Sequence, residues 1–143
     1  MQRSLIATLV LGTVALLVAW RSEAEHKLRT LAMTDGLTGV FNRRGFTTQG
    51  SSLLAHAARH QWPMTALMLD LDHFKRINDT HGHEAGDRAL RLFARLLGDT
   101  CRSGDLVGRL GGEEFGVLLL HNSAPAGLAL DRRLRKRLHA ASV

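Results

Sequence analysis

The chain has 143 residues, of which 45% are hydrophobic and 22% are charged. These proportions are typical of one globular domain and exclude a disordered or low-complexity chain. The single cysteine, Cys101, excludes an internal disulfide framework and a four-cysteine zinc site, and it fits a reducing compartment. The net charge of +6 favours an anionic partner, which could be a nucleotide, a nucleic acid or a lipid headgroup.

The N-terminal residues 1–21 are predicted to form a transmembrane anchor. No charged residue occurs between Ser4 and Trp20, and a helix of that length spans about 25 Å, near the short limit for a bilayer. More basic residues follow this segment than precede it, which places the rest of the chain in the cytoplasm, at the inner membrane. A cleaved signal peptide is the alternative, but no convincing small-x-small cleavage site follows Trp20.

Residues 22–34 are predicted to form a polar linker helix. Ala24, Leu28 and Leu31 form a narrow apolar seam at helical spacing. Such a seam either pairs two helices, as in a signalling coiled coil, or packs against its own domain.

Residues 35–143 are predicted to form the globular part, which begins with a turn leading into a helix. The expected elements are a helix from 43 to about 60, a strand over 64–71, a polar loop over 73–87, a helix over 86–98, a hairpin around Gly111-Gly112, and a helix over about 126–140. This order predicts an α+β, ferredoxin-like sheet covered by helices. That topology has one more strand, which does not occur before Val143.

Two pairs of acidic residues are the strongest candidates for chemistry. Asp70 ends the apolar strand and Asp72 follows two residues later, so period-two geometry puts both side chains on one face. Glu113 and Glu114 follow the glycine turn and point to opposite faces of an extended strand, so one of them can join Asp70. Divalent cations prefer such oxygen ligands. A magnesium-nucleotide site and salt bridges with the many arginines both remain open.

Three motifs in order and at matching spacing closely resemble the GGDEF family of diguanylate cyclases. They are Asp35-Gly-Leu-Thr-Gly with Asn42-Arg43-Arg44, the segment DLDHFKRINDTHGHEAGD over 70–87, and RLGGEEF over 109–115. The resemblance implies a nucleotide-cyclase-like fold and the condensation of two GTP molecules into cyclic di-GMP, with release of two pyrophosphates. Each 3′-hydroxyl attacks the α-phosphate of the other GTP. It therefore implies a homodimer that uses Mg²⁺ or Mn²⁺.

The resemblance also implies roles for individual residues. The metal ligands would be the Asp70 side chain, the Leu71 carbonyl and Glu113, with Glu114 as an additional ligand, and Glu113 would be the general base. The substrate contacts would be Asn78 and Asp87 on guanine with His83 beside them, the backbone at Phe74 and Lys75 near the phosphates, and Gly111 and Gly112 against the ligand. Glutamate in the third signature position is a common active variant of the family.

Arg102 and Asp105 match the family's RxxD inhibitory product site in pattern and in distance from the glycines, although a local ion pair is the alternative. The basic run 132–137 could suggest a nucleic-acid partner. Leu134 interrupts this run at core spacing, so a solvated helix face is favoured and no nucleic acid is expected.

Two functions follow from the resemblance. The first is a membrane-anchored diguanylate cyclase that works as a homodimer. The second is a truncated, non-catalytic module that binds GTP or cyclic di-GMP, or an inactive remnant. The intact acidic and guanine-binding motifs favour the first. The second is favoured by the end of the sequence, because in the family a further strand and helix follow residues 128–138 and supply Lys and Arg to the GTP phosphates.

Overall fold

The computed structural model describes residues 12, 16 and 33–141, without the side chain of Ala124. The chain divides into two compact units, residues 1–32 and 33–143, and the second unit is described below. The predicted membrane span and most of the predicted linker helix lie outside the described residues. Within the described part, no helix has both the length and the apolar character needed to cross a membrane.

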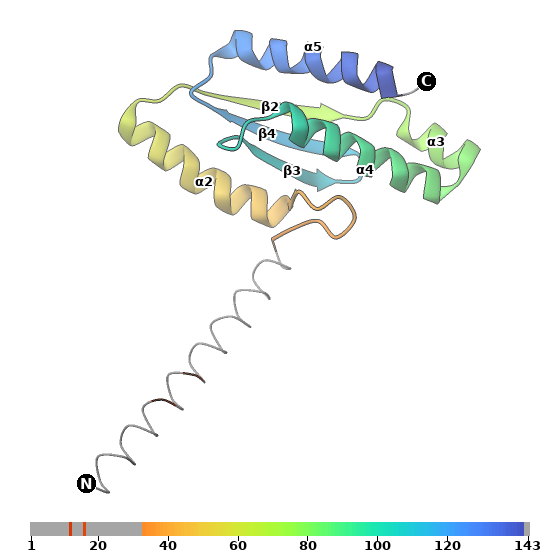
Figure 1. Cartoon of the computed structure of the whole chain (residues 1–143), viewed down its shortest axis with the longest axis horizontal. Coiled ribbons are helices and arrows are strands. Elements are labelled where there is room, and N and C mark those ends of the chain that lie inside the picture. The colour runs from red at the N-terminus through yellow and green to blue at the C-terminus, as the bar shows by residue number, and fades with distance from the viewer. Residues whose placement is uncertain (1–11, 13–15, 17–32, 142–143) are drawn as a thin grey trace, which may run out of the picture. The chain divides into compact units, whose positions relative to one another are not determined.

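The second unit alternates strands and helices along the chain (Figure 1). Its elements are β1 (Phe41–Asn42), α2 (Arg43–His60), β2 (Met64–Asp70), α3 (Phe74–His81), α4 (His83–Thr100), β3 (Leu106–Gly111), β4 (Glu114–Leu120) and α5 (Ala124–Ala141). The predicted hairpin and the three long helices are confirmed, and α4 and α5 extend beyond their predicted ends.

The prediction of a polar loop over residues 73–87 is wrong, because this segment forms α3 and the first turn of α4. Gly82, with a φ of 80°, reverses the chain between the two helices. Phe74 and Ile77 are half-buried at helical spacing in α3, so even this polar segment buries an apolar stripe. The result is a helical hairpin directly after β2.

The four strands form one mixed sheet in the order β1-β3-β4-β2. β4 is antiparallel to both neighbours, and the two-residue β1 is parallel to β3. The α+β class is as predicted. The hairpin turn, however, lies at Gly112 and Glu113 rather than at the two glycines, because Gly111 is the last residue of β3.

The main core lies between one face of the sheet and helices α4 and α5. Alternate residues of β4 point into it: Phe115, Val117 and Leu119 are at most 2% exposed. They pack with Leu90, Phe93, Ala94 and Leu97 of α4 and with Leu130 and Leu134 of α5. The rings of Phe93 and Phe115 meet edge-on, with 4.9 Å between their centroids.

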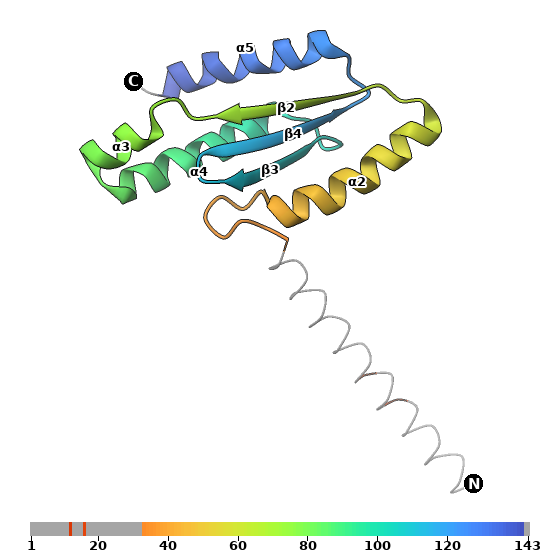
Figure 2. The ribbon, with the colours of Figure 1, turned by 180° about the vertical axis from the view of Figure 1, so that it is seen from behind.

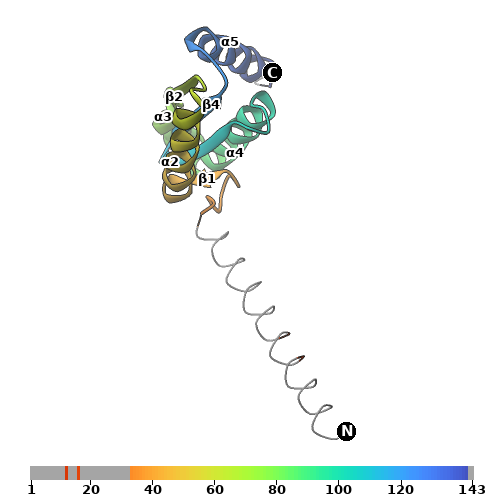
Figure 3. The same ribbon diagram turned by 90° about the vertical axis from the view of Figure 1, so that its left-hand side faces the viewer.

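Helix α2 packs on the opposite face (Figures 2 and 3). Asn42 caps its start, since its side chain accepts a hydrogen bond from the Gly45 N–H at 2.9 Å. Phe46 lies over Gly108 and Gly116, which are register partners on β3 and β4. A Cβ at either glycine would come within 2.8 Å of the Phe46 ring, so α2 can approach β3 closely only because these side chains are absent.

Candidate functional site

The sheet edge at the end of β2 brings two of the predicted carboxylates to opposite positions. Asp70, the last residue of β2, is the register partner of Glu114, the first residue of β4. Directly opposed residues of antiparallel strands carry their side chains on the same face. Both residues are exposed, whereas Glu113 is half-buried in the turn. The strand ends at Asp70, so the period-two argument does not extend to Asp72.

Arg43, at the start of α2, lies against this acidic edge. Its Nε donates to the Leu110 carbonyl at 2.6 Å, and its Nη2 is 3.9 Å from Glu114 Oε2. Of the two opposed carboxylates, Glu114 thus has a cationic neighbour, and Asp70 has no ion pair within the described part. Like charges placed directly opposite destabilise a sheet edge unless a cation offsets them.

The donor set at this edge fits a hard divalent cation bound together with a phosphate ligand. Within residues 33–141, no three acidic, histidine or cysteine side chains converge closely enough to hold a metal ion by themselves. Mg²⁺ is usually held by one or two carboxylates plus substrate phosphates and water, which needs no such cluster. The Leu71 carbonyl accepts only a long hydrogen bond from the Phe74 N–H, at 3.3 Å, and a second lone pair remains for a ligand.

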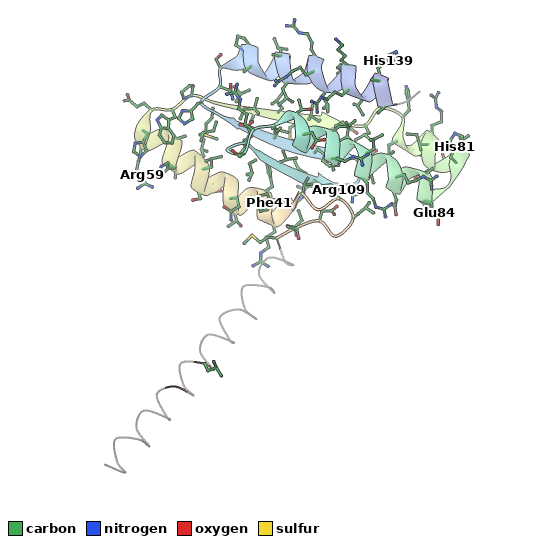
Figure 4. The ribbon with its side chains drawn as sticks, in the orientation of Figure 1. Phe41, Arg59, His81, Glu84, Arg109 and His139 are labelled. Carbon is green, nitrogen blue, oxygen red and sulfur yellow. The ribbon has the colours of Figure 1, made fainter. Side chains whose placement is uncertain are left out.

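The turn at Gly112 and Glu113, called the signature turn below, is held in place by Arg109. The sequence indicated no separate role for this residue. Gly112 has a φ of 49°, and its carbonyl accepts from Arg109 Nε at 2.8 Å. The same guanidinium contacts Asp35, with Nη1 at 3.2 Å from Oδ1. Figure 4 labels Arg109 near the sheet end where β3 finishes. The turn is therefore connected to the loop that begins the domain.

That loop is itself organised by Asp35. Its Oδ1 accepts hydrogen bonds from the Thr38 backbone N–H at 2.9 Å and from the Thr38 hydroxyl at 2.6 Å. Burial of Asp35 opposes ionisation, but the Thr38 hydrogen bonds and the Arg109 guanidinium outweigh burial and lower the pKa of this carboxyl. Asp35 is therefore an ionised anchor for both the loop and the turn.

The helical hairpin α3–α4 carries the residues that the resemblance assigns to guanine. Asn78 of α3 and Asp87 of α4 are half-buried, and His83 is exposed at the start of α4. The Asn78 Oδ1 is the buried side-chain polar atom that lacks a hydrogen-bond partner within the described part. A buried acceptor without a partner costs free energy, and this one lies against Gly86 of α4.

The N-terminus of α3 carries the residues assigned to the phosphates. The cap residue His73 has a left-handed backbone, with a φ of 61°, and its side chain makes no capping hydrogen bond. The first N–H groups of α3, at Phe74 and Lys75, thus have no side-chain cap, and the Phe74 N–H makes only a long hydrogen bond, at 3.3 Å, to the Leu71 carbonyl. Uncapped N–H groups at a helix start suit an anion.

A cavity of about 360 Å³ lies beside the end of β2. It is lined by the segment from Leu69 to Asp72, by Ile77 of α3, by α4, and by Asp131, Leu134, Arg135 and Leu138 of α5. Arg135 Nε is 3.0 Å from both carboxylate oxygens of Asp131. Asp70 and Asp72 therefore border a mostly apolar cavity that α5 lines on another side.

A second cavity, of about 280 Å³, contains Arg102 and Asp105 and lies between the end of α4, β4 and α5. The Asp105 side chain is hydrogen-bonded to the backbone of the domain. Its Oδ2 accepts from the Arg102 backbone N–H at 2.8 Å, and its Oδ1 accepts from the Leu120 backbone N–H at 3.1 Å. The alternative interpretation of the motif, a local ion pair between the Arg102 and Asp105 side chains, is not found among the described residues. Arg133, from α5, lines the same cavity and was not singled out from the sequence.

Comparison with known proteins places these features in a family. Residues 32–143 match the family described as diguanylate cyclase, GGDEF domain. The chain is 44% identical over 114 residues to the probable diguanylate cyclase DgcC of Escherichia coli, covering 78% of this chain and 30% of that protein. It is also 44% identical over 115 residues to the response regulator PleD of Caulobacter vibrioides, covering 80% of this chain and 25% of that protein.

Solved structures agree with these matches. The coiled coil and GGDEF domain of DgcB from Caulobacter crescentus, in complex with c-di-GMP, superposes with a TM-score of 0.80 at 29% identity, covering 87% of this chain and 65% of that one. The diguanylate cyclase SiaD of Pseudomonas aeruginosa, in complex with its activator SiaC, gives 0.69 at 32% identity, covering 94% and 54%. The chain thus spans under a third of the curated relatives given above, and it belongs to the GGDEF domain family of diguanylate cyclases.

Proposed function

We propose that this chain is the catalytic domain of a diguanylate cyclase, which condenses two GTP molecules into cyclic di-GMP with release of two pyrophosphates. The observation that carries the proposal is the register pairing of Asp70 with Glu114, beside the glycine turn and next to a helical hairpin with an unsatisfied amide. Together these features supply oxygen ligands, a close backbone approach and a polar base contact at one end of the sheet.

Each residue has a role in this proposal. Asp70, the Leu71 carbonyl and Glu113 would hold Mg²⁺ or Mn²⁺, with Glu114 as an additional ligand, and the cation would neutralise phosphate charge. Glu113 would take the proton from the attacking 3′-hydroxyl. Asp87 accepts from the guanine N1–H and N2–H₂ groups, and Asn78 faces its acceptors.

The reaction requires two GTP molecules, and one domain offers a single base site, so the active species is proposed to be a homodimer. The membrane anchor at residues 1–21, with the domain in the cytoplasm at the inner membrane, is part of the same proposal and rests on the sequence pattern alone.

The cavity at Arg102 is proposed to bind cyclic di-GMP as an inhibitory product. Its support is the presence of two arginines, Arg102 and Arg133, on separate elements around one cavity. Guanidinium groups form bidentate hydrogen bonds with phosphate and with the acceptor edge of guanine. Because Asp105 binds backbone N–H groups, the arginines would make the main contacts with the ligand.

The direct test is the incubation of the purified full chain with GTP and Mg²⁺, followed by chromatographic detection of cyclic di-GMP. Product that disappears in Glu113→Gln, while GTP binding persists, would support the proposal. GTP or cyclic di-GMP binding without any product would favour the alternative of a non-catalytic binding module. A chain that binds neither nucleotide would contradict both functions.

A further inference from the structure

The Asn78 side chain is confined by a glycine on the neighbouring helix. Gly86 is buried in α4 and faces Asn78 across the α3–α4 hairpin. A Cβ at position 86 would collide with the Asn78 Oδ1, would lie 2.9 Å from its Cγ, and would approach the Phe74 ring to 3.1 Å. The space that a side chain at 86 would fill is thus the space that the amide occupies.

The amide oxygen is the Asn78 atom that lies nearest to the Cβ position of Gly86. This oxygen is buried without a hydrogen-bond partner in the described part. A buried acceptor without a partner costs free energy, and the amide would avoid that cost by turning outward. The amide can lie in this place only because residue 86 has no side chain.

We infer that Gly86 is a positioning residue for nucleotide binding, which acts by leaving the space in which the Asn78 amide lies beside the proposed guanine site. The inference rests on the proposed function, because it adds a residue to the guanine site. An amide at this place can donate to the O6 or N3 acceptor of guanine, while the carboxylate of Asp87, which follows Gly86 on α4, matches the guanine donors. Gly86 touches no ligand in this scheme.

The same helix offers a matched control. Gly98 also lies in α4, and a Cβ there would meet nothing within 4 Å. Both Gly86→Ala and Gly98→Ala raise helix propensity by the same change, so a difference between them reports the contact with Asn78. The clashing atom is the end of a flexible side chain, so we expect Gly86→Ala to turn the amide away and to leave the fold intact.

The experiment compares four full-chain variants with the unmodified chain: Gly86→Ala, Gly98→Ala, Asn78→Ala, and the double variant Asn78→Ala with Gly86→Ala. The first readout is the pair of Asn78 side-chain amide NMR signals without nucleotide, assigned by their loss in Asn78→Ala. The second is GTP affinity by calorimetry. We expect Gly86→Ala to shift these signals and to weaken GTP binding about tenfold, the equivalent of one lost hydrogen bond. Gly98→Ala should do neither.

The double variant decides whether Gly86 acts through Asn78. We expect it to bind GTP as weakly as Asn78→Ala alone, because no amide remains to be displaced. Unchanged Asn78 signals in Gly86→Ala, or affinity losses that add in the double variant, would overturn the inference. If Gly86→Ala fails to fold, the double variant should still fold, and its failure would likewise contradict the inference. If the unmodified chain does not bind GTP, the proposed function is contradicted instead. The NMR signals would still test the contact between Gly86 and Asn78.

Discussion

Arg109 and Asp35 are 74 positions apart in the chain, yet their side chains meet at 3.2 Å, and Arg109 also donates to the carbonyl of Gly112. One guanidinium therefore joins the loop at the start of the domain to the signature turn. The two side chains are only 16% and 23% exposed, so solvent screens this pair less than a surface pair.

Replacing Arg109 with alanine should destabilise the domain measurably. The change removes charge-assisted hydrogen bonds to two loops and leaves Asp35 without its cation, which should cost about 1–3 kcal/mol in the free energy of unfolding. The control is Arg135→Ala, which breaks the exposed ion pair with Asp131 on α5 and should cost about 0.5 kcal/mol or less. Chemical denaturation measures both, and equal losses would contradict a special role for Arg109.

The lowered pKa of Asp35 predicts a specific acid sensitivity. A carboxyl whose pKa is lower in the folded state adds stability above its unfolded pKa, near about 4, and loses it as the pH falls through the folded pKa. Unfolding free energies between neutral and strongly acidic pH should therefore fall more steeply in the unmodified chain than in Asp35→Asn. At pH 7 the Asp35→Asn variant should have a lower free energy of unfolding than the unmodified chain. Parallel curves would show that Asp35 does not carry this effect.

Asp70→Asn should raise stability in metal-free buffer, because it removes one of two carboxylates placed directly opposite each other. Relief of such like-charge pairing contributes about 0.2–1 kcal/mol. The same substitution should abolish any rise in melting temperature on addition of Mg²⁺ and GTP, since Asp70 is the proposed ligand. Asp79→Asn, exposed on α3, is the control and should keep the Mg²⁺-dependent rise. A full rise in Asp70→Asn would remove Asp70 from the ligand set.

Arg102→Ala and Arg133→Ala should each weaken cyclic di-GMP binding by about tenfold or more, the effect of losing a hydrogen bond to a charged ligand. Arg132→Ala is the matched control, because Arg132 is an exposed neighbour on α5 that does not line the cavity. Calorimetric titration with cyclic di-GMP measures the three affinities. Binding that survives both cavity substitutions would place the product elsewhere.

Cys101 should resist alkylation at neutral pH. Burial and the nearby Asp105 carboxylate raise the pKa of this thiol to about 11, and the thiolate is the reactive form. Iodoacetamide labelling of the folded chain should be slow at pH 8, should accelerate as the pH approaches 11, and should become fast in denaturant. Rapid labelling of the native chain at pH 8 would contradict the burial of Cys101.

The parts of the fold with a regular apolar pattern were predictable from the sequence. The run ending at Asp70 and the stripe of Leu90, Phe93 and Leu97 identify a strand and a helix because burial dominates their composition. Helix α3 was missed because most of its residues are polar. Strand β1 was missed because two residues carry no periodicity.

The site was predictable in composition and less so in geometry. The motifs pointed to Asp70 and to the two glutamates, but which glutamate lies opposite Asp70 depends on the pairing register of β2 with β4, which alternation along a single strand does not reveal. The contact between Asp35 and Arg109, and that between Asn78 and Gly86, join residues on separate elements. Such pairings depend on tertiary packing and leave no local pattern.

The two ends of the Arg102–Asp105 motif are under different constraints. Asp105 closes a turn and accepts a hydrogen bond from the last residue of β4, whereas the Arg102 side chain is exposed and makes no hydrogen bond or ion pair with residues 33–141. A lineage released from feedback by its own product could therefore exchange the arginine freely while folding still preserved the aspartate. In that case an aspartate without its arginine would be the trace of lost regulation.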